Sequence, residues 1–268
     1  MQKLIELMAN AHPEPKCNEC KAALDFEFTF AFQPIVDVEA RQIFAYEALV
    51  RGPNGEGALD VLGRVNDSNR YRFDQSCRMK SILLAKKLGM DCRISINFLP
   101  NSIYQPELCI RTTIAAAEAA DFPLDKIIFE VTEGEQMRDP QKLLSIFRYY
   151  RDRGFSTAID DFGAGYAGLG LLAEFQPSLI KIDIALVRDI DSNAAKQAIV
   201  TGTLVTTRLL GIEVIAEGIE TAAEARWFKD NGVRLMQGYY FARPGFESLP
   251  KVSAWGFADQ VSLSDCVR

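Results

Sequence analysis

Short apolar runs rich in Val, Ile and Phe alternate, from about residue 26 onward, with longer stretches that have the pattern of helices. Each run has a polar residue at or near its end, and there are eight of them. They are FTFAFQ (28–33), IFAYEALVR (43–51), CRISIN (92–97), KIIFEVTE (126–133), FSTAIDD (155–161), LIKIDI (179–184), IEVIAE (212–217) and VRLMQGYY (233–240). Strands that alternate with helices in this way predict a largely parallel sheet covered by helices.

The helical stretches carry start and stop signals. Four of them end in a glycine followed by an apolar residue, in KKLGM, RDRGF, RLLGI and KDNGV, and glycine is the usual left-handed stop of a helix. Thr221 and Glu224 have the spacing of a capping box, which predicts that the last barrel helix starts directly after the run ending at Glu217. Both kinds of signal support the alternation of strands and helices.

The first two runs are joined by too few residues for a parallel crossover, which needs about a dozen. They are therefore expected to form an antiparallel hairpin with its turn near residue 39 or 40. This turn puts Gln33 roughly opposite Tyr46 and Glu47, although a bulge at Pro34 can shift the register. We expect Gln33 and Glu47 to be neighbours.

Eight strands of this kind fit either a closed (β/α)₈ barrel with a reversed first strand or an open doubly wound sheet. The polar residues favour the barrel, because they fall near C-terminal strand ends, and only a closed barrel brings those ends to one mouth. The predicted fold class is therefore α/β, a TIM-like barrel whose first strand is antiparallel. The polar residues are Glu47, Asn97, Glu130, Asp160, Asp161, Lys181, Glu217 and Gln237.

The composition is that of a globular protein of 268 residues, with 48% hydrophobic and 25% charged residues and a formal net charge of −6. The negative charge argues against a broad surface for polymeric nucleic acid, but not against a small anionic ligand held by metal ions. The N-terminal stretch MQKLIELMAN has a very short apolar run interrupted by Glu6. Neither a signal peptide nor a membrane span is expected, and a cytoplasmic location is predicted.

Six cysteines form no even framework, so reduced thiols are expected. Cys17 and Cys20, in CNEC, lie near the only histidine, His12, which is half of the pattern of a zinc site. A second Cys or His pair is missing nearby. Zinc binding and a free or redox-sensitive pair both stay open.

The stretch AIDDFGAGYAGLG (158–170) allows two interpretations. Gly163, Gly165 and Gly168 have the GxGxxG spacing of a dinucleotide-binding loop, and Asp183 lies 20 residues after Gly163, where a ribose-binding acid would be. However, the two aspartates directly before the first glycine would repel a pyrophosphate, and the motif follows the fifth strand rather than the first. A metal site is therefore favoured over an oxidoreductase site.

Carboxylates gathered at one barrel mouth would repel one another unless cations lie between them. Oxygen ligands without a nearby histidine point to Mg²⁺ or Mn²⁺, and five acids are more than one such ion needs, so two ions are expected. Asp160 and Asp161 can reach the same site only where their strand breaks, and Phe162 with Gly163 is expected to provide that break.

Lys181 and Asp183 are two residues apart in KIDI, so they are expected to face the same way and to pair. Held by Asp183 beside the metals, the Lys181 side chain could orient water or stabilise developing phosphate charge. Arg51 follows Glu47 by four residues and could bind a phosphate at the mouth. Together these groups favour hydrolysis of a phosphodiester over carbonyl or glycosidic chemistry.

The triplet EAL at residues 47–49, followed by Arg51, belongs to a larger set of motifs. With FQPIVD, SINFL, FEVTE, DDFG, KID, AEGIET and QGYYFARP in the same order, the chain resembles the EAL-type cyclic di-GMP phosphodiesterases. The resemblance implies a barrel domain over residues 26–250, an N-terminal extension with the CxxC pair over 1–25 and a C-terminal tail over 251–268. It also implies two Mg²⁺ or Mn²⁺ ions, hydrolysis of cyclic di-GMP to linear pGpG, and a homodimer.

The resemblance also implies roles for single residues. Lys181 matches the catalytic lysine, assisting in-line attack by a metal-bound water, with Glu217 as the alternative base. Gln33, Arg51 and Gln237 match substrate-contacting positions, and Asp183 is placed with them. The positions that match metal ligands, with Glu47 and Glu217 also counted as catalytic, are Glu47, Asn97, Glu130, Asp160, Asp161 and Glu217. All are intact, which favours an enzyme over a cyclic di-GMP receptor or protein-interaction module.

A loop after DDFG is implied to link the site to the dimer interface, held by Glu133, with Gly163, Gly165 and Glu220 in supporting positions. The family's commoner DDFGTGYSSL is here DDFGAGYAGL. Three hydroxyls are therefore lost, which is expected to weaken hydrogen bonds of the loop and to change the level rather than the type of activity. The changed residues are Ala164, Ala167 and Gly168.

Overall fold

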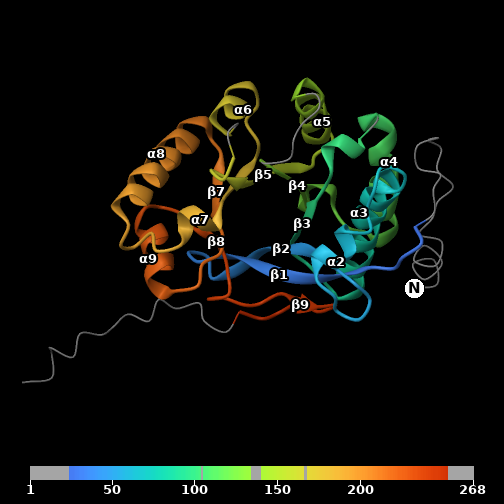
Figure 1. Ribbon diagram of the computed structural model, residues 1–268, viewed down its shortest axis with the longest axis horizontal. Helices are drawn as coiled ribbons and strands as arrows, with labels where there is room; N and C mark the ends of the chain where they lie inside the picture. Colours follow the sequence, from blue (N-terminus) through green and yellow to red (C-terminus); the bar gives the residue numbers. More distant parts are fainter. Residues whose placement is uncertain (1–23, 104, 134–139, 166–167, 253–268) are drawn as a thin grey trace, which may run out of the picture.

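The computed structural model describes residues 24–103, 105–133, 140–165 and 168–252. Within them, strands alternate with helices, and the sheet closes on itself because β1 pairs with both β2 and β8 (Figure 1). The short strand β9 pairs antiparallel with Ala31 and Phe32 of β1. The strands are β1 (Thr29–Asp37), β2 (Gln42–Arg51), β3 (Arg93–Asn97), β4 (Ile127–Thr132), β5 (Ser156–Phe162), β6 (Leu179–Ile182), β7 (Glu213–Ala216), β8 (Leu235–Gln237) and β9 (Gly245–Phe246). The predicted α/β barrel is confirmed.

Helices surround the barrel, and those drawn in Figure 1 lie outside the strands. They are α2 (Ala58–Leu62), α3 (Arg70–Lys87), α4 (Pro106–Ala120), α5 (Pro140–Asp152), α6 (Gly168–Glu174), α7 (Ile184–Val187), α8 (Ala194–Leu210) and α9 (Ala222–Asp230), with 3₁₀ turns at Pro100–Ser102 and Leu124–Lys126. The four predicted glycine stops all have positive φ: Gly89, Gly154, Gly211 and Gly232. The predicted capping box forms between Thr221 and Glu224. Every helix in the described part of the chain is too short or too polar to cross a membrane.

The reversed first strand is confirmed in detail. β1 runs antiparallel to β2 and β8, whereas the pairs from β2 to β8 are parallel. Gln33 lies opposite Glu47, and the register shifts between Ile35 and Val36, next to the proline that was expected to shift it. The hairpin therefore presents Gln33 and Glu47 at the same level of the barrel.

An apolar layer fills the barrel below its mouth and determines which residues face the site. Because strand side chains alternate between faces, the inward residue two positions further along each parallel strand forms the next layer. That next layer is polar. Glu47 lies two residues after Ala45 of the apolar layer, and Glu130 lies two residues after Ile128. In β1, which runs in the opposite direction, the polar Gln33 lies two residues before the apolar Ile35. The apolar layer consists of Ile35, Phe44, Ala45, Ile128, Ala158, Leu179, Ile215 and Leu235.

Gly238, directly after β8, allows the loop after β7 to approach its backbone. A β-carbon at this position would overlap the backbone of Ile219, whose N–H donates to Gln237 O at 3.0 Å. We expect Gly238→Ala to lower the free energy of unfolding by about 1–3 kcal/mol, because backbone rather than a flexible side chain must move. Denaturant unfolding would measure this. The control is Gly202→Ala in α8, with no neighbour within 4 Å, which should be stabilising or neutral; equal losses would contradict the prediction.

The proposed division into residues 1–25, 26–250 and 251–268 stays a prediction. Cys17, Cys20 and His12 lie outside the described residues, and so does Ala167. The alternatives for the CxxC pair therefore stay open.

Candidate functional site

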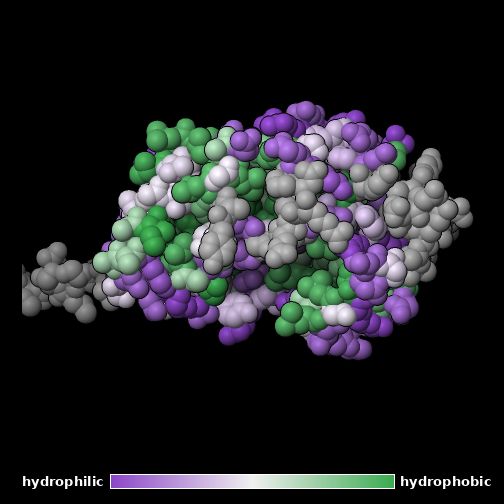
Figure 2. Space-filling model, turned by 45° about the horizontal axis from the view of Figure 1, so that its top comes forward, coloured by the Kyte–Doolittle hydropathy of each residue, from purple (hydrophilic) through white to green (hydrophobic). Residues whose placement is uncertain are grey.

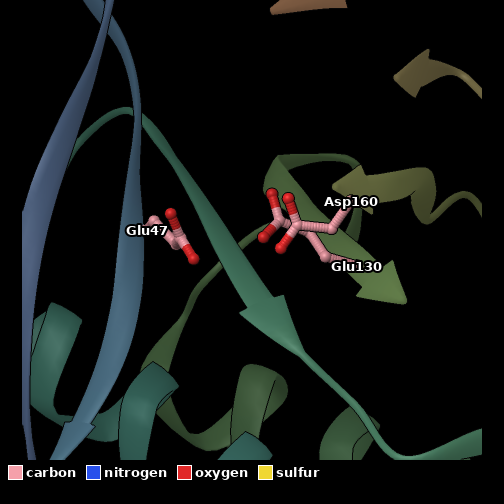
Figure 3. Close-up of side chains that lie close together, drawn as sticks. All are labelled: Glu47, Glu130 and Asp160. Atoms are coloured by element: carbon pink, nitrogen blue, oxygen red, sulfur yellow. The ribbon is translucent and has the colours of Figure 1, made fainter. Parts of the chain in front are cut away.

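Three carboxylates from three strands meet at the mouth of the barrel. Glu47 on β2, Glu130 on β4 and Asp160 on β5 are buried, and each offers an oxygen within 4.8 Å of the others. Figure 3 shows the carboxylates of Glu130 and Asp160 side by side, with Glu47 pointing toward them from β2. They share a level because each sits two residues beyond the apolar layer of its strand.

A second group shares Asp160 with the first. Asp160, Asp161 and Glu217 also offer oxygens within 4.8 Å of one another. Adjacent residues reach the same site because Asp161 has a left-handed backbone, with φ of +53°, and the β5–β6 register shifts between Ile159 and Phe162. The strand ends, as expected, at Phe162 before Gly163, and the irregularity at Asp161 lies within it; aspartate tolerates this conformation better than most residues.

Lys181 lies at the centre of both groups and is 1% exposed. Its Nζ is 2.7 Å from Glu217 Oε1, 3.0 Å from Glu130 Oε2, 3.1 Å from Asp160 Oδ1 and 3.3 Å from Glu47 Oε2. One ammonium thus contacts carboxylates from four different strands or strand ends. Such charge-assisted contacts hold the carboxylates in place.

The expected pair of Lys181 with Asp183 is wrong. β6 ends at Ile182, so the alternation that would put both side chains on one face does not continue. Asp183 instead caps α7, where its Oδ1 accepts a hydrogen bond from Ala185 N at 2.8 Å. The residues that hold Lys181 come from other strands.

Amide and hydroxyl groups surround the carboxylates. Asn97 Nδ2 donates to Glu47 Oε1 at 3.1 Å, and Gln237 Nε2 donates to Glu47 Oε2 at 2.8 Å. Gln237 Nε2 also lies 3.4 Å from Gln33 Oε1. Ser95 Oγ donates to Glu130, a contact that was not among the predicted ones although Ser95 lies two residues before Asn97 on the same strand. That spacing was the available signal.

Burial raises the pKa values of several carboxyl groups of the site, because the negatively charged form is poorly solvated there. Burial raises the pKa of Glu130 to about 8, with Lys181 opposing the shift and Glu47 and Asp160 adding to it. It raises the pKa of Asp161 to about 6 and that of Glu217 well above its usual value. Burial alone would also raise the pKa of Asp160, but the charge of Lys181 together with hydrogen bonds from Lys181, Glu217 and Asp161 N outweighs it, and the net pKa is lowered. One lysine does not neutralise five carboxylates, and added cations would relieve the imbalance.

The donor set fits divalent cations that prefer oxygen. Five carboxylates and the Asn97 amide supply only oxygen and amide donors, and the described part of the chain holds no histidine, since the only one is His12. Gln237 Oε1 is buried without a hydrogen-bond partner in the described structure, so this oxygen is available to accept a hydrogen bond from a ligand or to contact a cation. The two carboxylate groups overlap at Asp160, and each could hold a metal ion.

A cavity of about 390 Å³ opens beside the carboxylates. Its volume lies within the range of small-molecule sites. It is lined by Gln33, Glu47, Asp161, Ile184, Glu217, Gly218, Glu220, Gln237, Gly238 and Tyr239.

Arg51, which was predicted to bind a phosphate, does not line this cavity, and its guanidinium donates to Val50 O at 2.7 Å. Glu220 pairs with Arg188 at 2.7 Å.

Glu133 occupies the backbone donors of the glycine loop. Its Oε2 accepts from Gly163 N at 2.7 Å and from Gly165 N at 3.4 Å. A dinucleotide-binding loop would need these N–H groups for a pyrophosphate, so the structure disfavours that interpretation of GxGxxG. Glu133 instead ties the end of β4 to the segment that follows the two aspartates.

We expect Glu133→Ala to weaken Mn²⁺ binding by about 10–100-fold, the usual effect of removing a group that orients metal ligands. The reason is that Gly163 N loses its acceptor and Asp161, two residues earlier, loses its fixed backbone. Calorimetric titration with Mn²⁺ would measure the change. The matched control is Glu118→Ala on the exposed face of α4; the same loss in both variants would show that Glu133 has no special role.

Comparison with known families gives one match over most of the chain. The family model described as EAL domain matches residues 19–244. Among curated proteins, the blue light- and temperature-regulated antirepressor BluF of Escherichia coli is 30% identical over 243 residues, which cover 90% of this chain and 60% of BluF. The probable cyclic di-GMP phosphodiesterase PdeN of Escherichia coli is 27% identical, over 81% of this chain and 43% of PdeN. The chain thus spans about half the length of these relatives.

Solved structures agree with this match. The c-di-GMP bound form of a standalone versatile EAL protein from Vibrio cholerae O395 is 55% identical, with a TM-score of 0.84 over 86% of this chain and 97% of that one. The manganese and cyclic di-GMP complex of Klebsiella pneumoniae BlrP1 is 33% identical, with a TM-score of 0.80 over 94% of this chain and 68% of that one.

Proposed function

The chain belongs to the EAL domain family, and from this we propose that it hydrolyses cyclic di-GMP to linear pGpG with the help of divalent metal ions. The observation that carries the proposal is the pair of carboxylate groups sharing Asp160, with Lys181 in contact with four carboxylates. The similar Vibrio cholerae protein was solved with c-di-GMP bound, and PdeN is named a probable cyclic di-GMP phosphodiesterase. Both names support cyclic di-GMP as the substrate.

Two Mg²⁺ or Mn²⁺ ions would be held by the two groups. We assign Glu47, Glu130 and Asp160 with Asn97 to one ion, and Asp160, Asp161 and Glu217 to the other. When bound, the ions would lower the pKa of a water and neutralise charge on the phosphate. The manganese complex of BlrP1 supports this choice of metals.

The chain's own residues would position the substrate and move the proton. Gln33 and Gln237 line the cavity and would donate or accept hydrogen bonds to the ligand. Lys181 Nζ and Glu217 Oε1 lie 2.7 Å apart, so they can share the proton taken from the attacking water. Lys181 would also stabilise charge that develops on the phosphate. Arg51 and Asp183, as further substrate-contacting residues, belong to the same proposal.

Hydrolysis in the presence and absence of metal tests the proposal. Purified protein should release pGpG from cyclic di-GMP with Mg²⁺ or Mn²⁺ and should release none with a chelator. Chromatography would separate pGpG from GMP. Protein that binds Mn²⁺ and cyclic di-GMP but releases no pGpG would overturn the proposal in favour of a receptor.

That second candidate, a module that binds cyclic di-GMP and controls a partner protein, has one observation in its favour. BluF, which is 30% identical to this chain, is named an antirepressor. The intact carboxylates and lysine support the enzyme more strongly, since a receptor has no need of a buried catalytic lysine.

A homodimer through the outer face of α8 is part of the proposal. Its residues Ile199, Val205 and Leu209 are 54%, 51% and 82% exposed, and Figure 2 shows hydrophobic side chains gathered over this part of the molecule. We expect Leu209→Glu to convert a dimer to a monomer, because it places a charge on an apolar contact. Light scattering after size-exclusion chromatography would measure the mass, with Leu59→Glu on α2 as control; an unchanged dimer would contradict this face.

A cytoplasmic location also belongs to the proposal. Cys77, Cys92 and Cys109 are free thiols. Free thiols persist in a reducing compartment, which supports the cytoplasm.

A further inference from the structure

The one-turn helix α7 lies between two glycines that follow residues of the site. Gly163 comes two residues after Asp161, and Gly218 comes directly after Glu217. A β-carbon at Gly163 would lie 2.5 Å from Leu186 Cδ1, and one at Gly218 would overlap the side chain of Ile184. Both helix side chains therefore rest directly on glycine backbone, one on each side.

The start of α7 is fixed to the end of β5. Asp183 N donates to Phe162 O at 3.2 Å, and Asp183 Oδ1 caps the helix at Ala185 N. Asp183 follows Lys181 by two residues. The helix thus begins at a fixed place relative to Lys181 and the aspartates.

The end of α7 is fixed to the segment after Gly218. Arg188 Nη2 lies 2.7 Å from Glu220 Oε1, and Asp189 N donates to Glu224 Oε1 at 3.1 Å. The other oxygen of Glu224 accepts from Glu220 N at 2.9 Å and Thr221 N at 3.0 Å. A single buried carboxylate therefore joins α7 to the loop that carries Glu217.

We propose that Ile184 and Leu186 are positioning residues, which set the backbone at Gly218 and Gly163 and thereby hold Glu217 and Asp161 close to Asp160. The inference rests on the proposed function, because the distance between these carboxylates matters only if they bind metal together. Metal ligands tolerate errors of about 0.2 Å. A β-carbon at Gly218 would lie 2.8 Å from Ile184 Cβ, an atom attached directly to the helix backbone, so the backbone on one side would have to move by about 0.6 Å to reach ordinary contact, which is beyond that tolerance.

Left-handed backbone strain alone does not account for the arrangement. Gly211 has φ of +71°, close to the +66° of Gly218, but a β-carbon there has no neighbour within 4 Å. Alanine at either position carries a similar backbone cost. Only alanine at Gly218 meets α7, so the two variants separate positioning from strain.

The experiment is a calorimetric Mn²⁺ titration of the full chain without cyclic di-GMP, together with thermal unfolding in metal-free buffer. Gly218→Ala should weaken Mn²⁺ binding by about tenfold or more, the effect seen when ligand orientation is lost, whereas Gly211→Ala should lower the melting temperature and leave Mn²⁺ affinity unchanged. Equal Mn²⁺ affinities of these two variants would overturn the inference. Leaving out the substrate matters, because Ile184 also lines the cavity.

A double variant, in which a smaller residue at 186 makes room for a β-carbon at 163, tests the positioning role independently. Leu186→Ala removes both atoms that a β-carbon at Gly163 would meet within 4 Å. The double variant Gly163→Ala with Leu186→Ala should therefore bind Mn²⁺ more tightly than Gly163→Ala alone; a double variant no better than the single one would overturn the inference. If Gly218→Ala does not fold, Leu186→Ala alone must still weaken Mn²⁺ binding, compared with Leu59→Ala at an exposed position of α2.

Failure of the inference differs from failure of the proposed function. Wild-type protein that binds Mn²⁺ but releases no pGpG contradicts the phosphodiesterase and leaves the positioning test intact. Wild-type protein that hydrolyses cyclic di-GMP, with Gly218→Ala equal to Gly211→Ala, contradicts only the positioning role. Wild-type protein that does not bind Mn²⁺ contradicts both.

Discussion

Replacing Glu47 with alanine is expected to lower kcat/KM for cyclic di-GMP by about 10³-fold or more, equivalent to about 4 kcal/mol of transition-state stabilisation. Glu47 contributes an oxygen to the first carboxylate group and connects three other residues of the site. It accepts from Asn97 and Gln237, and it lies 3.3 Å from Lys181 Nζ. The variant would lose a proposed metal ligand, and Asn97, Gln237 and Lys181 would each lose a contact with its carboxylate.

The hydrolysis assay with Mn²⁺ measures the loss, and Glu39→Ala is the matched control. Glu39 is a glutamate of the same hairpin, but its side chain is exposed in the turn. Activity of Glu47→Ala above a tenth of the wild-type value would contradict the assignment of Glu47 as a ligand. A dinucleotide-binding oxidoreductase would bind a nicotinamide regardless of Glu47, so that alternative is tested with the same variant.

Replacing Lys181 with methionine is expected to have two separate effects. Turnover should fall by about 10²–10⁴-fold, the usual contribution of a group that takes part in proton transfer. The metal-free protein should also lose roughly 3–5 kcal/mol of stability, because removing one partner of a buried ion pair leaves the other charges uncompensated. Here four carboxylates would face one another without the ammonium.

Thermal unfolding with and without Mn²⁺ distinguishes these effects. Mn²⁺ should raise the melting temperature of Lys181→Met more than that of the wild type, since the added cations replace the missing charge. Lys87→Met on the exposed surface of α3 is the control. A Lys181→Met variant with wild-type metal-free stability would show that the lysine does not hold the carboxylates.

The local pattern of the chain predicted most of the fold. Apolar runs predicted the strands, the short link before residue 42 predicted the reversed first strand, and glycines predicted four helix ends. These features depend on residues that are close in sequence, so local rules describe them. The same two-residue alternation placed polar residues in the layer above the apolar core.

Local rules failed where the backbone leaves regular structure. They paired Lys181 with Asp183, but β6 ends one residue after Lys181 and Asp183 caps α7. The strand end at Phe162 and Gly163 was predicted correctly, but the left-handed backbone of Asp161 within β5 was not. The spacing of Ser95 from Asn97 could have placed Ser95 on the inner face, but its partner Glu130 and the contacts of α7 with two glycines join segments that no local pattern relates.

The sequence by itself determined the strand order, the reversed hairpin and the residue types at the strand ends. Only the tertiary structure decided which of them touch: Lys181 bonds to Glu130 across 51 residues, and Gln237 bonds to Glu47 across 190. The physical reason is closure of the sheet, since distances across a barrel follow from the register and twist of all its strands together, whereas side-chain alternation specifies only the face of one strand at a time.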